Sequence, residues 1–263
     1  MICRLICLLT LALSASNAAW SESKFLDFSA IHLPNYVGLG VGGANQYVGA
    51  VEYIAGLVPF ARKNLSGTRY LSLQGNYATA NVIDHPNWQV GPAGLLRFGR
   101  DDVKDEVVDT LPSINPTVEL GGFVSWQYIS PDDPRDRWQF AGSVTQDVLD
   151  VHGGYVANIS ARRFVGVGRF AIAGLALASS FGSEDYSDTY FSVTENQALP
   201  AFDAGAGVRD LRLQFLFVQP LSFSWSVGGG FQYQYLLGDA ADSPITEERG
   251  NRNQLLFGVG IAH

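Results

Sequence analysis

The residues of this chain that are suited to catalysis are few, and histidine is the rarest of them. The four histidines are His32, His85, His152 and His263. His152 is the best candidate for a catalytic base, because acyl hydrolases pair a histidine base with a serine nucleophile. Its neighbours are the turn glycines Gly153 and Gly154, and no serine lies two residues away on the same strand face. We therefore interpret His152 as a turn residue and predict no catalytic residue.

A second candidate for chemistry is the acidic run Asp-Asp-Val-Lys-Asp-Glu at residues 101–106. Calcium loops place oxygen ligands at alternate positions around a glycine, and this run lacks that spacing. A solvated acidic loop is the favoured interpretation, and divalent cations shared with lipid phosphates are the alternative. A GxSxG elbow, a phosphate-binding glycine loop and a His–Cys metal spacing are also lacking. No metal or cofactor site is predicted.

The composition excludes several classes of protein. Of the 263 residues, 47% are hydrophobic and 16% are charged, so the chain is too apolar to be disordered. The net charge of -8 excludes binding of nucleic acid through counterion release. Only three of the 17 basic residues are lysines, and no polybasic patch for an anionic membrane surface is present. The many glycines and aromatic residues favour β structure.

The first eighteen residues have the order of a secretory signal peptide. Arg4 is followed by an apolar stretch that ends at Leu13 and by small residues up to Ala18, after which we expect cleavage. A membrane anchor is the alternative, but the apolar stretch is about half of the ~20 residues that a spanning helix needs. We predict a signal peptide over 1–18, which contains both cysteines, and a single domain over 19–263.

Beyond this segment, apolar residues recur with a period of two. From Phe223 to Tyr235, alternate residues are mostly aromatic or aliphatic, and the residues between them are small or polar. The same alternation occurs over Thr117–Tyr128, Trp138–Thr145 and Leu211–Phe217. No apolar run approaches the length of a spanning helix, whereas a tilted strand crosses a bilayer in about 9–11 residues. The pattern therefore favours membrane-spanning strands.

The apolar faces of these strands end in aromatic side chains. Such ends are occupied by Trp126, Tyr128, Trp138, Tyr233 and Tyr235. Amphipathic rings prefer the level of the lipid headgroups, and a sheet in lipid satisfies its backbone only when it closes. The sequence therefore predicts an all-β fold, an antiparallel transmembrane β-barrel, in the bacterial outer membrane.

Eleven strands can be delimited from the alternation. Besides the four above, they are 36–43, 48–60, 69–80, 88–100, 155–165, 168–179 and 253–263. Bacterial single-chain barrels have even numbers of strands, so we predict twelve strands, with ten as the alternative. The missing strand is expected at 25–33, or else within 180–208 around Tyr190–Thr194.

The connections between the strands are unequal in length. Long acidic segments occupy 101–116, 180–208 and 237–252, whereas Val165–Gly168 and Gln219–Ser222 are tight turns. Long loops of outer-membrane barrels usually face the outside and short turns the periplasm. We therefore expect the C-terminus on the periplasmic side.

The polar strand faces carry four charged residues, Glu119, Asp147, Arg162 and Arg212. A charge on the lipid face costs about 2–4 kcal/mol at the bilayer midplane. These side chains are therefore expected in the lumen, where they form a network or line a pore.

Seven groups of residues share their order and spacing with a known family. They are Gly91–Ala93 with Arg97–Asp102, Thr117–Gly121, Gln146–Asp147 with His152–Gly154, Thr189–Val193, Leu199–Gly207, Leu237–Ile245 and Arg249–Gln254. The chain resembles the MipA/OmpV family from about residue 36 onward, and Gly238–Ile245 is the most specific match. Two positions depart from the family pattern: Ala50 replaces a serine, and His263 replaces the usual C-terminal aromatic residue.

The resemblance implies an outer-membrane protein of the MltA-interacting type. Members of the family are described as scaffolds that join a membrane-bound lytic transglycosylase to a bifunctional penicillin-binding protein in peptidoglycan assembly, and others as surface antigens or adhesins. It thus implies a non-enzymatic scaffold that contacts outer-membrane lipid and needs no cofactor. The residues leave other functions open: a small-solute pore, suggested by Arg162 and Arg212, an adhesin with binding loops at 101–116 and 180–208, and a lipid enzyme resting on His152 alone.

Overall fold

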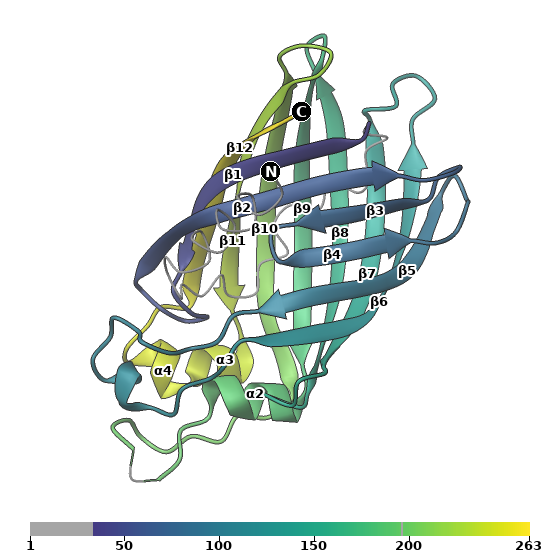
Figure 1. The fold of residues 1–263 in the computed structure, drawn as a ribbon. Coiled ribbons are helices and arrows are strands. Elements are labelled where there is room, and N and C mark those ends of the chain that lie inside the picture. Colours follow the sequence, from purple (N-terminus) through teal and green to yellow (C-terminus); the bar gives the residue numbers. More distant parts are fainter. Residues whose placement is uncertain (1–33, 196) are drawn as a thin grey trace, which may run out of the picture.

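The computed structural model describes residues 34–195 and 197–263, in which twelve antiparallel strands form a closed barrel (Figure 1). The predicted signal peptide lies outside the described residues. Each strand pairs with its neighbours in the sequence, and β1 pairs with β12 to close the barrel. The prediction of twelve strands is confirmed, and the alternative of ten is excluded. The strands are β1 (Tyr36–Asn45), β2 (Tyr53–Asn64), β3 (Tyr70–Gln74), β4 (Tyr77–Asn81), β5 (Trp88–Arg97), β6 (Thr117–Ile129), β7 (Arg137–Asp147), β8 (Tyr155–Val167), β9 (Ala171–Gly182), β10 (Gly207–Pro220), β11 (Ser226–Leu236) and β12 (Asn253–Ala262).

The twelfth strand comes from a region predicted as one strand, 69–80. This region forms the hairpin β3–β4, joined by Gly75 and Asn76. Gly75 has a φ of 58°, a left-handed conformation that glycine adopts without steric cost. The buried positions are even-numbered in β3 and mainly odd-numbered in β4. A continuous strand cannot change the parity of its inward face, and for that reason the prediction of one strand was wrong.

The missing strand does not lie in the second place that the sequence suggested. The first, 25–33, lies outside the described residues. The second, Tyr190–Thr194, is wrong: it includes the end of helix α2 (Glu184–Phe191), and then Val193 makes an isolated β-bridge to Phe202. Alternation over so few residues does not distinguish a strand from the end of a helix.

The barrel is apolar outside and polar inside, as the alternation predicts. On β1, the outward Val37, Leu39 and Val41 are each more than half exposed, whereas Gly40 between them is buried. Aromatic side chains gather towards both ends of the strands. They are Trp88, Trp126, Tyr128, Trp138 and Trp225 towards one end, and Tyr53, Tyr155, Tyr233 and Tyr235 towards the other. The outer surface thus has an apolar band between two aromatic girdles.

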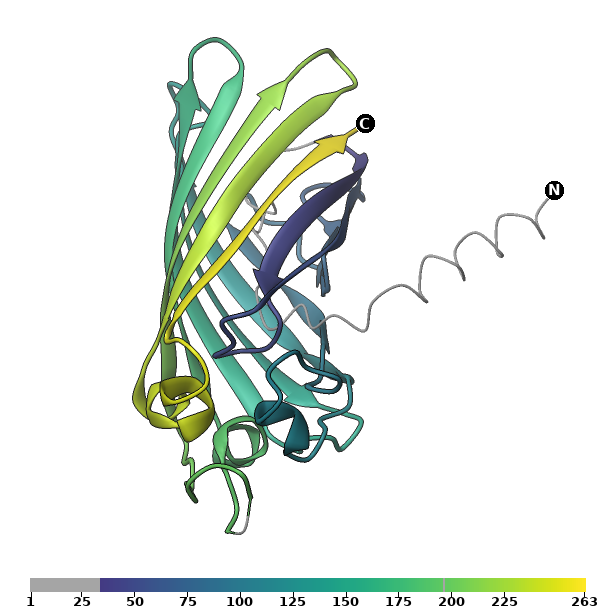
Figure 2. The same ribbon diagram turned by 90° about the vertical axis from the view of Figure 1, so that its left-hand side faces the viewer.

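The two ends of the barrel differ in structure (Figure 2). At one, which we call the loop end, lie the helices α2, α3 (Gly238–Asp242) and α4 (Pro244–Glu247) and the short 3-10 helix η2 (Val108–Thr110). At the other, the turn end, lie the short β8–β9 and β10–β11 connections and the C-terminal end of β12 (Figure 1). The long and short connections therefore separate as predicted. None of the helices in the described chain is long and apolar enough to span a membrane.

The C-terminal residue takes part in closing the barrel. The N–H of His263 donates to the carbonyl of Val37 at 2.9 Å, and the N–H of Val37 donates back at 3.0 Å. The imidazole packs edge-on against Trp225, with 4.8 Å between the ring centroids. His263 thus supplies a ring at the end of β12.

Two adjacent glycines of β6 allow a test of how closely the backbones of neighbouring strands approach each other. A Cβ atom at Gly121 would lie 1.9 Å from the carbonyl oxygen of Val144, whereas one at Gly122 would have only the oxygen of Gly91 nearby, at 3.5 Å. We expect Gly121→Ala to destabilise the barrel by about 1–3 kcal/mol, because the backbone of β7 must move. The urea midpoint of refolded protein, followed by heat-modifiable gel mobility, measures this.

The matched control is Gly122→Ala, for which we expect an unchanged midpoint. Equal midpoints for the two variants would contradict the close approach of β6 and β7 at Gly121.

Candidate functional site

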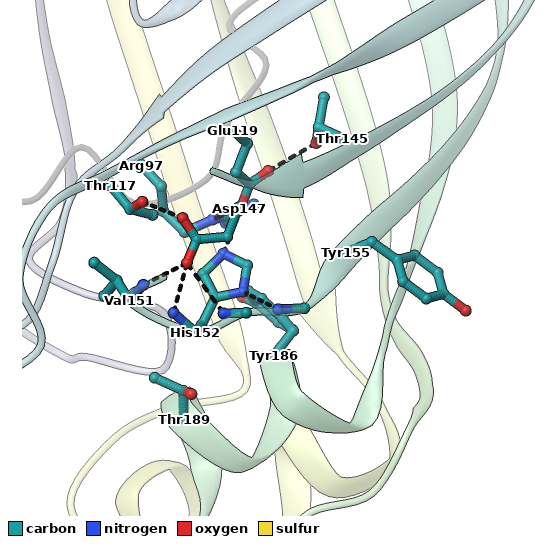
Figure 3. Close-up of polar contacts among 12 residues, drawn as sticks. Arg97, Thr117, Glu119, Thr145, Asp147, Val151, His152, Tyr155, Tyr186 and Thr189 are labelled. Atoms are coloured by element: carbon teal, nitrogen blue, oxygen red, sulfur yellow. Dashed lines mark hydrogen bonds and ion pairs between the residues drawn. The ribbon is translucent and has the colours of Figure 1, made fainter. Parts of the chain in front are cut away.

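A network of buried charged side chains fills the lumen near the loop end (Figure 3). Glu119 on β6 is fully buried and forms an ion pair with Arg97 on β5, which is also buried. Its second oxygen accepts a hydrogen bond from the hydroxyl of Thr145 on β7 at 2.7 Å. The three residues meet because the register of β5, β6 and β7 brings these inward positions to one level of the barrel. Both oxygens of the buried carboxylate are therefore satisfied.

Asp147, the last residue of β7, organises the turn that follows it. Its carboxylate accepts hydrogen bonds from the backbone N–H groups of Leu149, Val151, His152 and Gly153, at 2.6–3.0 Å. The hydroxyl of Thr117 on β6 donates to the same carboxylate. One buried carboxylate thus fixes a turn in which Asp150 and Gly153 both have positive φ.

His152 is held in this turn through both of its ring nitrogens. Nδ1 accepts a hydrogen bond from the N–H of Gly154 at 3.1 Å, so Nε2 carries the proton and donates to Glu119 at 3.0 Å. The ring packs edge-on against Tyr186 and Tyr190 of α2 and is 5% exposed. Because neither nitrogen is available to accept a proton from a substrate, the geometry gives His152 a positioning function in the turn.

A second buried network surrounds Asp210 on β10. This carboxylate pairs with Arg209 and Arg212 at 2.9–3.0 Å, and the hydroxyl of Ser180 and the amide of Gln234 donate to it. A β-bulge between Val208 and Asp210 allows consecutive residues to face the lumen. The guanidinium of Arg209 also donates to the hydroxyl of Tyr186 on α2 at 2.8 Å. Tyr186 therefore connects the two networks.

The four charged residues singled out in the sequence are all buried on inward faces. Glu119 and Asp147 belong to the first network and Arg212 to the second. Arg162 lies apart from both and donates to Gln139 at 3.4 Å. Arg97, Arg209 and Asp210 were not predicted as lumen residues. Arg97 follows the apolar inward residues Ala93 and Leu95, and the bulge interrupts the alternation at Arg209 and Asp210.

The long loops cover these networks as a compact layer, which we call the loop cap: α2, α3, α4, η2 and their connections. Tyr186, Phe191 and Ile245 are fully buried in its two apolar clusters. Ser243 caps α4 and donates its hydroxyl to the carbonyl of Phe191 at 2.6 Å. Ala50 lies in one of these clusters with no exposed surface, so its methyl group suits this apolar site.

The acidic segment 101–106 is attached to the loop cap through Asp105. This carboxylate pairs with Arg249 at 2.9 Å and accepts the N–H groups of Val107 and Val108. Burial alone would raise the pKa of Asp105, but the N–H of Val108, the Arg249 guanidinium and the N–H of Val107 together lower it below its usual range. The prediction of a solvated loop is therefore wrong at Asp105. Among the described residues, no group of His, Cys, Asp and Glu side chains is arranged to hold a metal ion.

A closed antiparallel barrel with an apolar exterior, two aromatic girdles and a polar interior defines the class of transmembrane β-barrels. Residues 37–263 match the family model described as MltA-interacting protein MipA, so the chain belongs to that family. This confirms the resemblance found in the sequence. Fold and family together support an outer-membrane barrel.

Similarity to individual known proteins is more distant. A solved structure described as the NanC porin in a rhombohedral crystal form is 9% identical, with a TM-score of 0.45, and the match covers 87% of this chain and 98% of that chain. Among curated proteins, none matches this chain significantly.

The contribution of the buried Arg97–Glu119 ion pair to stability can be measured by substitution. We expect Glu119→Ala to destabilise the barrel by about 3–5 kcal/mol, because the guanidinium of Arg97 then loses its carboxylate in a buried site. The urea midpoint in detergent micelles measures the loss. As a control, Arg163→Ala removes a half-exposed pair with Asp136 and is expected to change stability by no more than about 1 kcal/mol. Similar losses for the two variants would contradict the importance of burial.

The Asp105–Arg249 pair gives a prediction of pH dependence. Because the pKa of Asp105 is lowered in the folded protein, its stabilisation of the loop cap is complete above the unfolded pKa of about 3.9 and is lost as the pH falls through the lower, folded pKa. We expect cleavage of segment 101–116 by pepsin, normalised to an unfolded reference peptide, to increase only below about pH 4.

The control for this experiment is Asp105→Asn, which cannot titrate. Its cleavage should be high and independent of pH over the same range. If the wild-type protein and the variant show the same pH profile, Asp105 does not hold the segment.

Proposed function

We propose that this protein is a non-enzymatic outer-membrane scaffold, which brings a lytic transglycosylase and a bifunctional penicillin-binding protein together during peptidoglycan assembly. The proposal is supported by membership of a family described as MltA-interacting. The observation that carries it is the contrast between the two ends of the barrel. Among the described residues, the loop end is covered and internally bonded, whereas exposed apolar side chains lie at the turn end.

The loop cap favours a binding function over free passage of solutes. Two charge networks and the packed helices lie across the loop end. Below them, inward glutamines bond to neighbouring side chains, for example Gln214 to Gln232 at 2.6 Å and Gln139 to Ser125 at 2.8 Å. A lumen filled in this way leaves little room for a solute to diffuse through the barrel. Partners would therefore be bound on the outer surfaces of the protein.

We assign the turn end to the periplasm. The predicted signal peptide over 1–18 would direct the chain of residues 19–263 across the inner membrane, and short connections of such barrels usually face the periplasm. The apolar strand faces then contact outer-membrane lipid. With this orientation, the turn end is the part of the protein that murein-remodelling enzymes can reach.

The β10–β11 connection is the best candidate for the contact with a partner. Leu221 is 62% exposed, and the side chain of Phe223 is fully exposed at the tip. Phe170, in the neighbouring β8–β9 connection, is 56% exposed. Exposed apolar side chains that project beyond a barrel rim are suited to a protein interface, because aromatic anchors contribute most to binding energy.

Two other functions compete with the scaffold. The arginines of the lumen favour a small-solute pore, and conductance above background in planar bilayers would support it. The long acidic segments of the loop cap favour an adhesin, which would place binding at the opposite end of the barrel. The two competing functions do not use Phe223, so substitution there separates them from the scaffold.

Co-purification of a lytic transglycosylase with variants of the β10–β11 connection tests the scaffold. We expect the double variant Leu221→Ser, Phe223→Ser to lose most of the lytic transglycosylase that co-purifies with the wild-type barrel from mildly solubilised outer membranes, because the apolar contact is removed. The control is Leu149→Ser, which changes a side chain of similar exposure (58%) at the loop end and should retain the enzyme. Absence of any transglycosylase with the wild-type barrel would contradict the scaffold.

A further inference from the structure

A groove of about 590 Å³ crosses the apolar outer face of the barrel between β5 and β10. Its floor consists of three small outward residues, Gly142 on β7, Ala161 on β8 and Ser179 on β9. Larger side chains form its walls: Trp88, Val124, Trp126, Phe140, Ile159, Leu177 and Leu211. We call this feature the outer groove. It opens towards the lipid that surrounds the barrel.

The register of β7, β8 and β9 produces the outer groove. In the sheet, Ala161 lies directly between Phe140 and Leu177, so a methyl group separates two much larger side chains. Gly142 and Ser179 are the diagonal neighbours of Ala161 on the two flanking strands. Diagonal neighbours lie about 7–8 Å apart, and the three gaps therefore join into one groove of a width that suits an alkyl chain.

A cation lies beside the outer groove, at the level of the aromatic girdle near the turn end. Arg163 follows Ala161 by two residues on the outward face of β8 and is paired in the sheet with Trp138. Its guanidinium lies 5.5 Å from the ring centroid of Trp138. Outward positions of the described strands carry one other charged residue, Lys63 on β2. Because a charge on the lipid face is tolerated only near the headgroups, Arg163 marks the headgroup level of the leaflet at the turn end.

Arg163 is accompanied by a carboxylate at the same level. Its Nη2 lies 3.3 Å from Oδ2 of Asp136, and the two side chains are 32% and 35% exposed. The other oxygen of Asp136 accepts the N–H of Gly166 at 3.0 Å, which fixes the pair in position. The nearby Arg135 is engaged by Asp133 and by backbone carbonyls of the β8–β9 connection. A guanidinium has five N–H donors, so Arg163 can bind an oxyanion while it keeps Asp136.

We propose that the outer groove binds one phospholipid with a zwitterionic amine headgroup, from the leaflet at the turn end. An acyl chain of this lipid lies over Gly142 and Ala161, the phosphate accepts hydrogen bonds from Arg163, and the ammonium group contacts Asp136. Lipid chains are as apolar as the barrel face, so the chain gains packing contacts and the headgroup supplies the selectivity. Guanidinium–phosphate hydrogen bonds are of the strong, charge-assisted kind. The inference uses the placement of the barrel in the outer membrane and does not depend on the scaffold function.

Native mass spectrometry of the folded barrel tests the proposal. The protein is purified from outer membranes, freed of lipid by detergent exchange and titrated with dipalmitoyl phosphatidylethanolamine, of which we expect one molecule to bind per barrel. Dipalmitoyl phosphatidylglycerol has the same chains but lacks the ammonium group, and dipalmitoylglycerol lacks the phosphate as well. Each of these two lipids is expected to bind at least about tenfold more weakly, because an interaction with a charged group is lost.

Two pairs of variants locate the site on the barrel. Gly142→Leu fills the groove, and a Cβ atom at this position meets its nearest neighbour at 3.8 Å, so the backbone need not move. Its control is Gly122→Leu, at an outward glycine of β6 that does not line the groove and has its nearest neighbour at 3.5 Å. Arg163→Gln removes the cation, and Lys63→Gln is the control for loss of an outward charge. We expect the first variant of each pair to bind phosphatidylethanolamine about tenfold more weakly and both controls to bind as the wild-type protein does.

Heat-modifiable mobility shows for each variant that the barrel is folded. Equal affinities for the three lipids, or wild-type affinity in either Gly142→Leu or Arg163→Gln, would overturn the proposal. A dimer in the wild-type spectrum that Gly142→Leu abolishes would assign the groove to a second copy of the chain and would also overturn it. Because the assay contains no murein enzyme, its outcome is separate from that of the co-purification experiment.

Discussion

Closure of the sheet is the constraint on which the rest of this structure depends. In lipid no water is available to the backbone, so every N–H and C=O of the wall must pair within the barrel. The chain meets this requirement by pairing Gly38–Gly43 of β1 with Phe257–Ala262 of β12, up to the reciprocal hydrogen bonds of Val37 and His263. Closure also creates a lumen, in which the buried polar side chains must find hydrogen-bond or ion-pair partners among one another.

The interior differs between the two halves of the barrel: buried ion pairs fill the half near the loop end, and a cavity lies in the half near the turn end. Near the loop end, Glu119 binds one arginine and Asp210 binds two, each with neutral donors as well, and Tyr186 joins the two groups. Buried carboxylates with several donors hold a fixed arrangement, because a buried charge without partners costs several kcal/mol. This rigid layer gives the loop cap a base on which to pack. Towards the turn end, glycines replace the long side chains and leave a cavity.

The family-specific stretch of the sequence has a structural explanation in the loop cap. Gly238 begins α3 with a positive φ of 51°, Asp239 accepts the N–H of Gly205, and Ser243 caps α4 and binds the carbonyl of Phe191. These contacts join segments far apart in the chain. The resemblance in Gly238–Ile245 therefore corresponds to the joint between α2 and α4, and a barrel of the same class with different loops would not need it.

The class of fold and the inward and outward faces could be predicted from the sequence, because a period of two and aromatic strand ends depend only on neighbouring residues. The number of strands followed from the even-number rule for closed barrels, since the alternation alone delimited eleven. The sequence also placed Glu119, Asp147, Arg162 and Arg212 inside the barrel. Which of these side chains contact one another depends on strand register and on loop packing. The pairing of Glu119 with Arg97 and His152 depends on the register of three strands, and the burial of Asp105 depends on Arg249, which follows it by 144 residues. The β3–β4 hairpin also depends on tertiary contacts, because its tip at Gly75 is fixed by the pairing of β3 with β2 and of β4 with β5 as well as by the local sequence.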